Sequence, residues 1–269
     1  MKLLHITGFI SILWRKIKLK IVKCVSTIEE FSPVDFKKLN IGVEIQDFVE
    51  PNLKEIEIEK LVSQYKTLLR DFPYTKSLHG PFLDLKPVSP DEDIRNISYK
   101  KYFRTLEIAS KLDIDYVIFH SQINPWLSEP LIKSLNNKQN KEFWNSILKE
   151  AKDFDGTVLL ENIFEEDPFF LKELIETIDM PNVKICLDIG HAKLRTNEDL
   201  GKWIEELKPY IEYIHFHWNE GLYDEHNRPE DKNIKYIKEL LLRHNINPII
   251  ALEYKVYNLK EEVQRIKLK

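Results

Sequence analysis

The chain has 269 residues, with 40 Lys and Arg against 44 Asp and Glu, which gives a formal net charge of −4. A hydrophobic fraction of 43% with abundant charges of both signs is typical of a globular protein and excludes a disordered chain. The acidic balance gives no overall attraction to nucleic acid or acidic membranes, although it leaves room for a local basic groove. Because single barrels of this length are common, we expect one domain.

The N-terminal stretch MKLLHITGFISILWRKIKLK has an apolar run followed by a basic cluster. The run is too short to span a bilayer, and a secretory signal would carry its charges first. We therefore expect residues 1–17 to be an N-terminal extension, with an interfacial anchor as the alternative, and residues 18–269 to be the barrel domain. Cys24 and Cys186 lie in apolar runs, which favours buried thiols and a cytoplasmic protein without membrane contact.

Eight short apolar runs bounded by breakers predict β-strands. They are Lys20–Ser26, Gly42–Gln46, Lys76–His79, Tyr116–His120, Thr157–Asn162, Lys184–Asp188, Tyr213–His217 and Ile249–Glu253. Between them, apolar residues at helical spacing predict helices. These are Lys60–Phe72, Lys101–Leu112, Lys141–Phe154, Phe169–Ile178, Lys202–Ile211 and Ile234–His244.

This alternation of strand and helix indicates a parallel sheet, because parallel neighbours need a crossover connection. Eight such units in one α/β domain favour a closed (β/α)₈ TIM barrel. An open doubly wound sheet is the alternative fold. It is disfavoured because none of the seven glycines forms a GxGxxG or GxxxxGK phosphate loop.

Most of the predicted strands end in histidine or carboxylate side chains. These residues are His79, His120, Glu161, Asp188, His215, His217 and Glu253. In a barrel the C-terminal ends of the strands meet at one mouth, so six strands would aim potential metal ligands into one pocket. A single such residue is more often a hydrogen-bonded residue or a helix cap. Several buried ionisable groups together need a compensating charge, and a metal ion is the usual one.

Three further candidates lie in loops: His191 after the sixth strand, and Asp224 and His226 after the seventh. Each could bind a second metal or the substrate. His217 shares a strand face with His215, and a hydrogen-bonded rim residue is an equal alternative for it. Carboxylate and imidazole ligands without cysteine predict a catalytic divalent site, with zinc or manganese favoured and magnesium or cobalt as alternatives.

Several stretches occur together in a familiar order: SLHGPFLDL, FHSQ, LLENI, CLDIGHAKL, HFHWNEG with DEH, and ALEY. As a set they resemble the xylose isomerase-like barrel superfamily, which joins sugar isomerases and epimerases with endonuclease IV. The resemblance implies that Glu161, Asp188, His215 and Glu253 bind the metal shared across the superfamily. It also implies that His79, His120, His191, Asp224 and His226 match the additional zinc ligands of endonuclease IV.

The function that this resemblance implies is a metal-dependent isomerase or epimerase that acts on a sugar or sugar phosphate through an enediolate. Glu161 and Glu253 would be its catalytic base and acid. The expected partner is a small carbohydrate, and an oligomer is compatible with the sequence. The alternative is an endonuclease IV-like zinc phosphodiesterase that acts on abasic DNA. A third hypothesis is a barrel that has lost catalytic activity and binds a sugar or a metal as a sensor.

Two departures weaken the likeness to endonuclease IV. Trp218 and Asn219 follow His217, where that enzyme usually carries HxND. Gly190 also replaces the cysteine or alanine common between the aspartate and histidine of DxxH. The segment HFHWNEGLYDEH is more similar to the isomerase-type HxHxNxGxxDxH pattern, so the isomerase is the first expectation.

Overall fold

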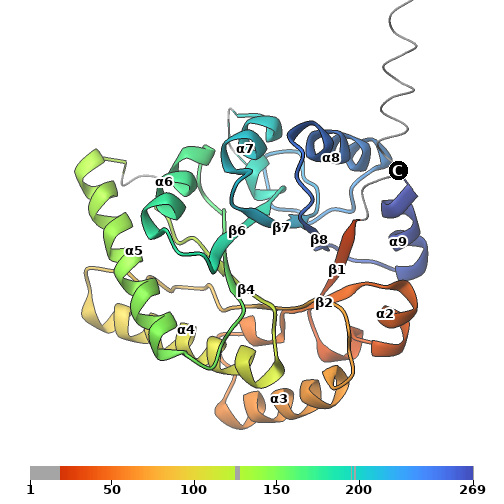
Figure 1. The fold of residues 1–269 in the computed structure, drawn as a ribbon, viewed down its shortest axis with the longest axis horizontal. Coiled ribbons are helices and arrows are strands. Elements are labelled where there is room, and N and C mark those ends of the chain that lie inside the picture. The colour runs from red at the N-terminus through yellow and green to blue at the C-terminus, as the bar shows by residue number, and fades with distance from the viewer. Residues whose placement is uncertain (1–18, 125–127, 195, 197, 269) are drawn as a thin grey trace, which may run out of the picture.

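The structure is a computed structural model that describes residues 19–124, 128–194, 196 and 198–268. Eight parallel strands close into a barrel in chain order, which confirms the predicted TIM barrel (Figure 1). The strands are β1 Lys20–Val25, β2 Gly42–Ile45, β3 Lys76–His79, β4 Tyr116–His120, β5 Thr157–Glu161, β6 Val183–Asp188, β7 Ile211–Phe216 and β8 Ile249–Leu252. The predicted extension, residues 1–17, lies outside the described residues.

Helices surround the barrel (Figure 1). They are α2 Pro33–Leu39, α3 Glu55–Leu69, α4 Glu92–Leu112, α5 Pro130–Glu150, α6 Pro168–Ile178, α7 Leu200–Leu207, α8 Asp231–His244 and α9 Leu259–Leu268. The sequence pattern indicates α3 to α8 but not the short α2 and α9. The α5 helix begins well before Lys141 because Pro130 suits its first turn and the Glu129 side chain accepts the backbone N–H of Ile132. No helix of the described residues has the length and apolarity to cross a membrane.

The outer layer of the core lies between the strands and the helices. Tyr102 on α4 packs against Phe119 of β4, with ring centroids 4.3 Å apart, and both are fully buried. Trp203 on α7 is also fully buried. Truncation of such an aromatic to alanine typically costs about 3–5 kcal/mol, so this layer is a main source of stability. Both cysteines are buried and free, as the sequence predicts.

The barrel lumen changes from apolar to polar along the strands. An apolar cluster fills its lower part, formed by Val22, Cys24, Ile118, Leu159, Cys186, Tyr213, Ile249 and Ala251. Successive side chains of a strand point to opposite faces, so the residue two positions further on points inward again. That residue is His120 on β4, Glu161 on β5 and Asp188 on β6. The C-terminal mouth of the barrel is therefore lined with ionisable groups.

Candidate metal centre

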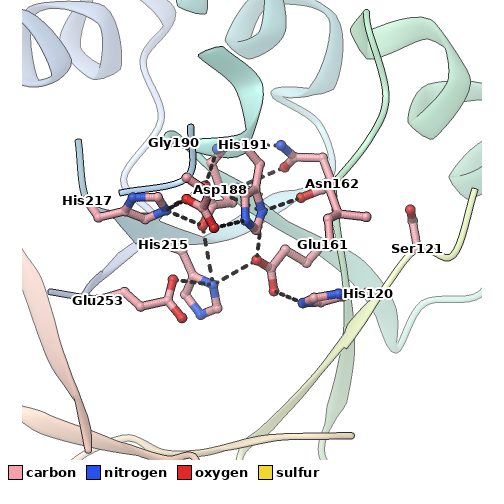
Figure 2. Close-up of polar contacts among 12 residues, drawn as sticks. His120, Ser121, Glu161, Asn162, Asp188, Gly190, His191, His215, His217 and Glu253 are labelled. Atoms are coloured by element: carbon pink, nitrogen blue, oxygen red, sulfur yellow. Dashed lines mark hydrogen bonds and ion pairs between the residues drawn. The ribbon is translucent and has the colours of Figure 1, made fainter. Parts of the chain in front are cut away.

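Four side chains from neighbouring strands converge at the mouth. Glu161, Asp188, His215 and Glu253 each offer a ligand atom, and these atoms all lie within 4.8 Å of one another (Figure 2). Nδ1 of His215 lies 3.2 Å from an oxygen of Glu161 and 3.2 Å from an oxygen of Glu253. It lies 3.8 Å from an oxygen of Asp188. The convergence expected from the strand ends is present in the folded chain.

The bonding of this group fits a divalent cation. His215 Nδ1 and Glu253 Oε2 are buried and have no hydrogen-bond partner among the described residues. In the same part of the chain, every ion-pair partner of Glu161, Asp188 and Glu253 is a histidine, and no Lys or Arg reaches them. Three carboxylates buried in this way need a positive charge, and carboxylate oxygens with imidazole nitrogens suit zinc or manganese.

Glu161 lies between two groups of histidines (Figure 2). Its Oε2 is 3.2 Å from Nε2 of His79 and 3.8 Å from Nε2 of His120. Its Oε1 is 3.3 Å from Nδ1 of His191 and 3.2 Å from Nδ1 of His215. Burial alone would raise the pKa of Glu161, but the surrounding imidazoles, with His215 and His120 foremost, hold it well below its ordinary value. One oxygen of this carboxylate therefore faces His79 and His120, and the other faces His191 and His215.

His79 and His120 form the side of the mouth beyond Glu161. Nδ1 of His79 donates to the Gly80 carbonyl at 2.8 Å, which leaves Nε2 directed at Glu161. The Phe82 ring stacks on His120, with centroids 4.4 Å apart and planes 19° apart. Burial lowers the pKa of His120 to about 3, so this imidazole is neutral and can act as a ligand.

A further group combines residues from the segments that follow β6 and β7. His191, His217, Asp224 and His226 also offer ligand atoms within 4.8 Å of one another. Oδ2 of Asp224 is 3.2 Å from Nε2 of His191 and 3.0 Å from Nε2 of His226. Burial opposes a positive charge on His226, but the hydrogen bond to Asp224 and the nearby Glu253 raise its pKa to about 9. The histidines predicted in the loops thus reach the same mouth.

Asp188 connects the two ligand groups. Both of its oxygens lie 3.1 Å from Nε2 of His217, and Oδ1 accepts the backbone N–H of His191 at 2.6 Å. Asn162 fixes the backbone of Asp188: its Oδ1 accepts the Asp188 N–H at 2.9 Å, and its Nδ2 donates to the Asp188 carbonyl at 3.0 Å. The carboxylate is therefore held between the group around His215 and the group around His191.

Gly190 makes room for His217. A Cβ atom on Gly190 would lie 1.9 Å from Cε1 of His217, closer than any real contact. The unusual glycine of the DxxH segment, Gly190, therefore occurs together with His217, the second histidine of HFH. Glycine is required here by a close approach, because any larger residue would displace the imidazole.

Glu44 and Gln46 also belong to the site, although the strand-end pattern of the sequence does not predict them. Glu44 is fully buried in β2 and lies within hydrogen-bonding distance of His215 Nε2, at 3.0 and 3.1 Å for its two oxygens. Gln46 donates to Glu253 at 2.9 Å. The available signal is the run GVEIQ, where a carboxylate interrupts an apolar strand two residues before a second polar side chain.

The sequence of the chain matches a known protein family. Residues 41–268 match the sequence profile of the family described as xylose isomerase-like TIM barrel. The chain belongs to this family. Family members typically bind divalent metals, and the superfamily acts on small sugars or on DNA.

Two relatives of this xylose isomerase-like barrel match part of its sequence. An uncharacterized protein of Methanocaldococcus jannaschii is 29% identical over 70% of this chain and 66% of its own length. A probable endonuclease 4 of Aquifex aeolicus is 26% identical over 61% of this chain and 57% of its own length. The chain thus spans less than two thirds of the length of either protein.

Solved structures share the same barrel. A protein from Thermus thermophilus, TTHB071, soaked with ZnCl2, is 25% identical with a TM-score of 0.71, and the match covers 92% of this chain and 97% of that one. A D-tagatose 3-epimerase-like protein is 23% identical with a TM-score of 0.68, covering 92% and 95% of the two chains. The second likeness is one of fold alone.

Proposed function

We propose that this protein is a metal-dependent phosphodiesterase of the AP endonuclease type, with a multinuclear centre at the barrel mouth. The observation that carries the proposal is the position of Glu161, whose two oxygens face separate histidine groups. A carboxylate in that position is well placed to act as a ligand of two cations at once. A single cation bound by Glu161, Asp188, His215 and Glu253 would leave His79 and His120 without a metal to bind.

In this proposal the side chains form three adjoining ligand groups. The first holds His79 and one oxygen of Glu161, with Nε2 of His120 3.8 Å from the same oxygen. The other oxygen of Glu161 joins Asp188, His215 and Glu253 in the second. His191, Asp224 and His226 make the third, beside His217.

The proposed reaction is hydrolysis of one phosphate ester bond. Water adds to phosphorus, the P–O bond to the leaving alcohol breaks, and the products are a phosphomonoester and an alcohol. Bound divalent ions would neutralise the phosphate and lower the pKa of the attacking water. The chain holds the ligands on rigid strand ends, and Phe82, stacked on His120, gives the mouth an apolar wall. Support also comes from the 26% identity to a probable endonuclease 4.

The sugar isomerase is the second candidate, and one observation favours it. A cavity of about 670 Å³ beside Glu253 is lined by polar and apolar groups, among them Gln46, His226 and Tyr254. That volume suits a small molecule better than a duplex. In this reading Glu161 and Glu253 exchange protons with the substrate while the cation stabilises the enediolate.

A paired assay separates the two candidates. The purified protein is analysed for bound metal, then given an abasic-site duplex and a panel of ketoses, each with zinc or manganese and with a chelator. We expect more than one ion per chain and chelator-sensitive cleavage of the duplex. His79→Ala with His120→Ala should abolish cleavage. One ion per chain with epimerised ketose, retained in the His79→Ala and His120→Ala double variant, would instead support the isomerase.

A further inference from the structure

We infer that Glu44 of β2 and Gln46, which follows that strand, are positioning residues. Glu44 selects the nitrogen of His215 that binds the metal, and Gln46 orients Glu253 toward that nitrogen. The inference rests on His215 and Glu253 as ligands in the proposed function. It assigns a role to β2 and to the residue that follows it.

Glu44 accepts hydrogen bonds from three side chains. Nε2 of His215 lies 3.1 Å from its Oε1 and 3.0 Å from its Oε2. The Tyr213 hydroxyl donates to Oε2 at 2.8 Å, and Nε2 of Gln46 donates to Oε1 at 3.1 Å. Glu44 is 0% exposed, and its ion-pair partner among the described residues is His215. The Glu44 carboxylate is therefore buried, and both of its oxygens accept hydrogen bonds from neighbouring side chains.

These contacts determine the orientation of the His215 ring. An ionised carboxylate can only accept hydrogen bonds, so Nε2 of His215 must carry a hydrogen whatever the charge of the ring. Nδ1 is then the nitrogen that remains for a cation. It is buried, lacks a hydrogen-bond partner among the described residues and faces Glu161 and Glu253 at 3.2 Å. Without Glu44 either nitrogen could carry the hydrogen, and part of the binding-competent population would be lost to the other tautomer or to a rotated ring.

Gln46 determines the orientation of the Glu253 carboxylate in a similar way. Its Nε2 group has two hydrogens, and it donates to Oε1 of Glu44 at 3.1 Å and to Oε1 of Glu253 at 2.9 Å. Because Oε1 of Glu253 is held in this way, Oε2 is the oxygen directed at Nδ1 of His215. Gln46 thus ties Glu253, which follows β8, to Glu44 of β2, and Glu44 in turn holds His215 of β7. In the closed barrel, β2 and β8 lie on opposite sides of β1.

A competing role for Glu44 is direct metal binding. Cys24, Glu44, His215 and Glu253 also have potential ligand atoms within 4.8 Å of one another. A cation there would displace the hydrogen bond between Glu44 and His215. It would also use the thiol of Cys24, so the variant Cys24→Ser distinguishes ligation from positioning.

The first test measures zinc affinity by competition with a chromophoric chelator. Glu44→Met keeps the side-chain length but removes the acceptor, and loss of such a partner typically weakens metal binding about 10–100-fold. Gln46→Leu should weaken it less, and Glu44→Gln should recover part of the loss. Cys24→Ser should leave affinity unchanged. Glu262→Gln, a change at another buried carboxylate with three side-chain partners, is the matched control and should also leave it unchanged.

The second test observes the His215 ring directly in the zinc-loaded protein, by two-bond ¹H–¹⁵N correlation. We expect the ring hydrogen on Nε2 in wild type and a shifted or averaged signal in Gln46→Leu and Glu44→Gln, both of which should fold. Unchanged zinc affinity in Glu44→Met and Gln46→Leu, or a hydrogen on Nδ1 in wild type, would overturn the inference. Absence of phosphodiesterase activity with intact zinc binding would overturn only the proposed function, whereas a wild type that binds no zinc would overturn both.

Discussion

The imidazole of His226 stacks on that of His217, with ring centroids 3.9 Å apart and planes 3° apart. His226 adopts φ 45°, in the left-handed region that non-glycine residues seldom use. The isolated bridge between Trp218 and Asn227 closes the loop between them and returns His226 to the mouth. A residue far along the loop is therefore fixed against a residue at the end of β7.

Substitution of Gly190 tests the importance of this stack. In Gly190→Ala the added carbon would collide with the His217 ring, so we expect His217 to move and the contact with Asp188 to break. Zinc content per chain, measured by elemental analysis, should fall while the circular dichroism spectrum stays helical. Gly201→Ala on α7 is the control, because its added carbon meets mainly the Asp199 side chain and none of the ligand groups. Full zinc retention in Gly190→Ala would show that His217 does not support the centre.

Glu161 and Glu253 should differ in their effect on metal content. Glu161 contacts two histidine groups, whereas the ion-pair partner of Glu253 among the described residues is His215 alone. We expect Glu161→Gln to lose more bound metal per chain than Glu253→Gln. Elemental analysis after gel filtration measures this difference. Equal losses in the two variants would argue against a bridging Glu161.

Metal binding should stabilise the fold, because the ligand groups come from strands far apart in the chain. A ligand present at a hundred times its dissociation constant contributes about 2.7 kcal/mol. For a chain of this size that corresponds to a rise of roughly 5–10 °C in the unfolding midpoint. Calorimetry with added zinc and with excess chelator measures the shift. The Asp188→Asn variant should show a much smaller difference between the two conditions.

Glu262 makes the stability of the chain sensitive to acid. It lies on α9 and accepts hydrogen bonds from Arg228, Arg265 and Tyr254. Burial alone would raise its pKa, but the two guanidinium groups and the phenol hold it below the ordinary value of 4.5. Since the folded-state pKa is depressed, this stabilisation is complete above pH 4.5 and is lost as the pH falls through the folded pKa.

The Glu262→Gln variant tests that linkage. At neutral pH it should lower the free energy of unfolding by about 1–3 kcal/mol, because the charged hydrogen bonds are replaced by neutral ones. Between about pH 5 and pH 3 the difference from wild type should shrink, which urea unfolding at a series of pH values measures. A constant difference across this range would show that Glu262 is not the titrating group.

The sequence predicts much of the fold because each strand is a short apolar run that ends in a polar residue. The same pattern predicts His79, His120, Glu161 and Asp188 at the mouth, since parallel strands in a barrel end at one face. Glu44 does not follow from this rule, because it lies inside a strand and looks like an exposed residue of a half-buried sheet. Only the barrel closure places it opposite His215.

Loop residues are harder to assign from sequence for a related reason. The position of His226 depends on a left-handed backbone conformation and on a bridge between Trp218 and Asn227, neither of which has a strong sequence signal. The role of Gly190 likewise depends on a contact with His217, which follows another strand. Both features follow from packing and not from local preference.

The pairing of β1 with β8 brings the first strand of the barrel against the last. Glu253 follows β8 directly, so the proposed set of ligands is complete only after β8 has been synthesised and has paired with β1. Nascent chains would therefore expose the carboxylates and imidazoles of β3 to β7 before the site can close. In the proposed centre, an ion captured before β8 pairs with β1 would be held by an incomplete set of ligands, from which it would escape more easily than from the closed barrel.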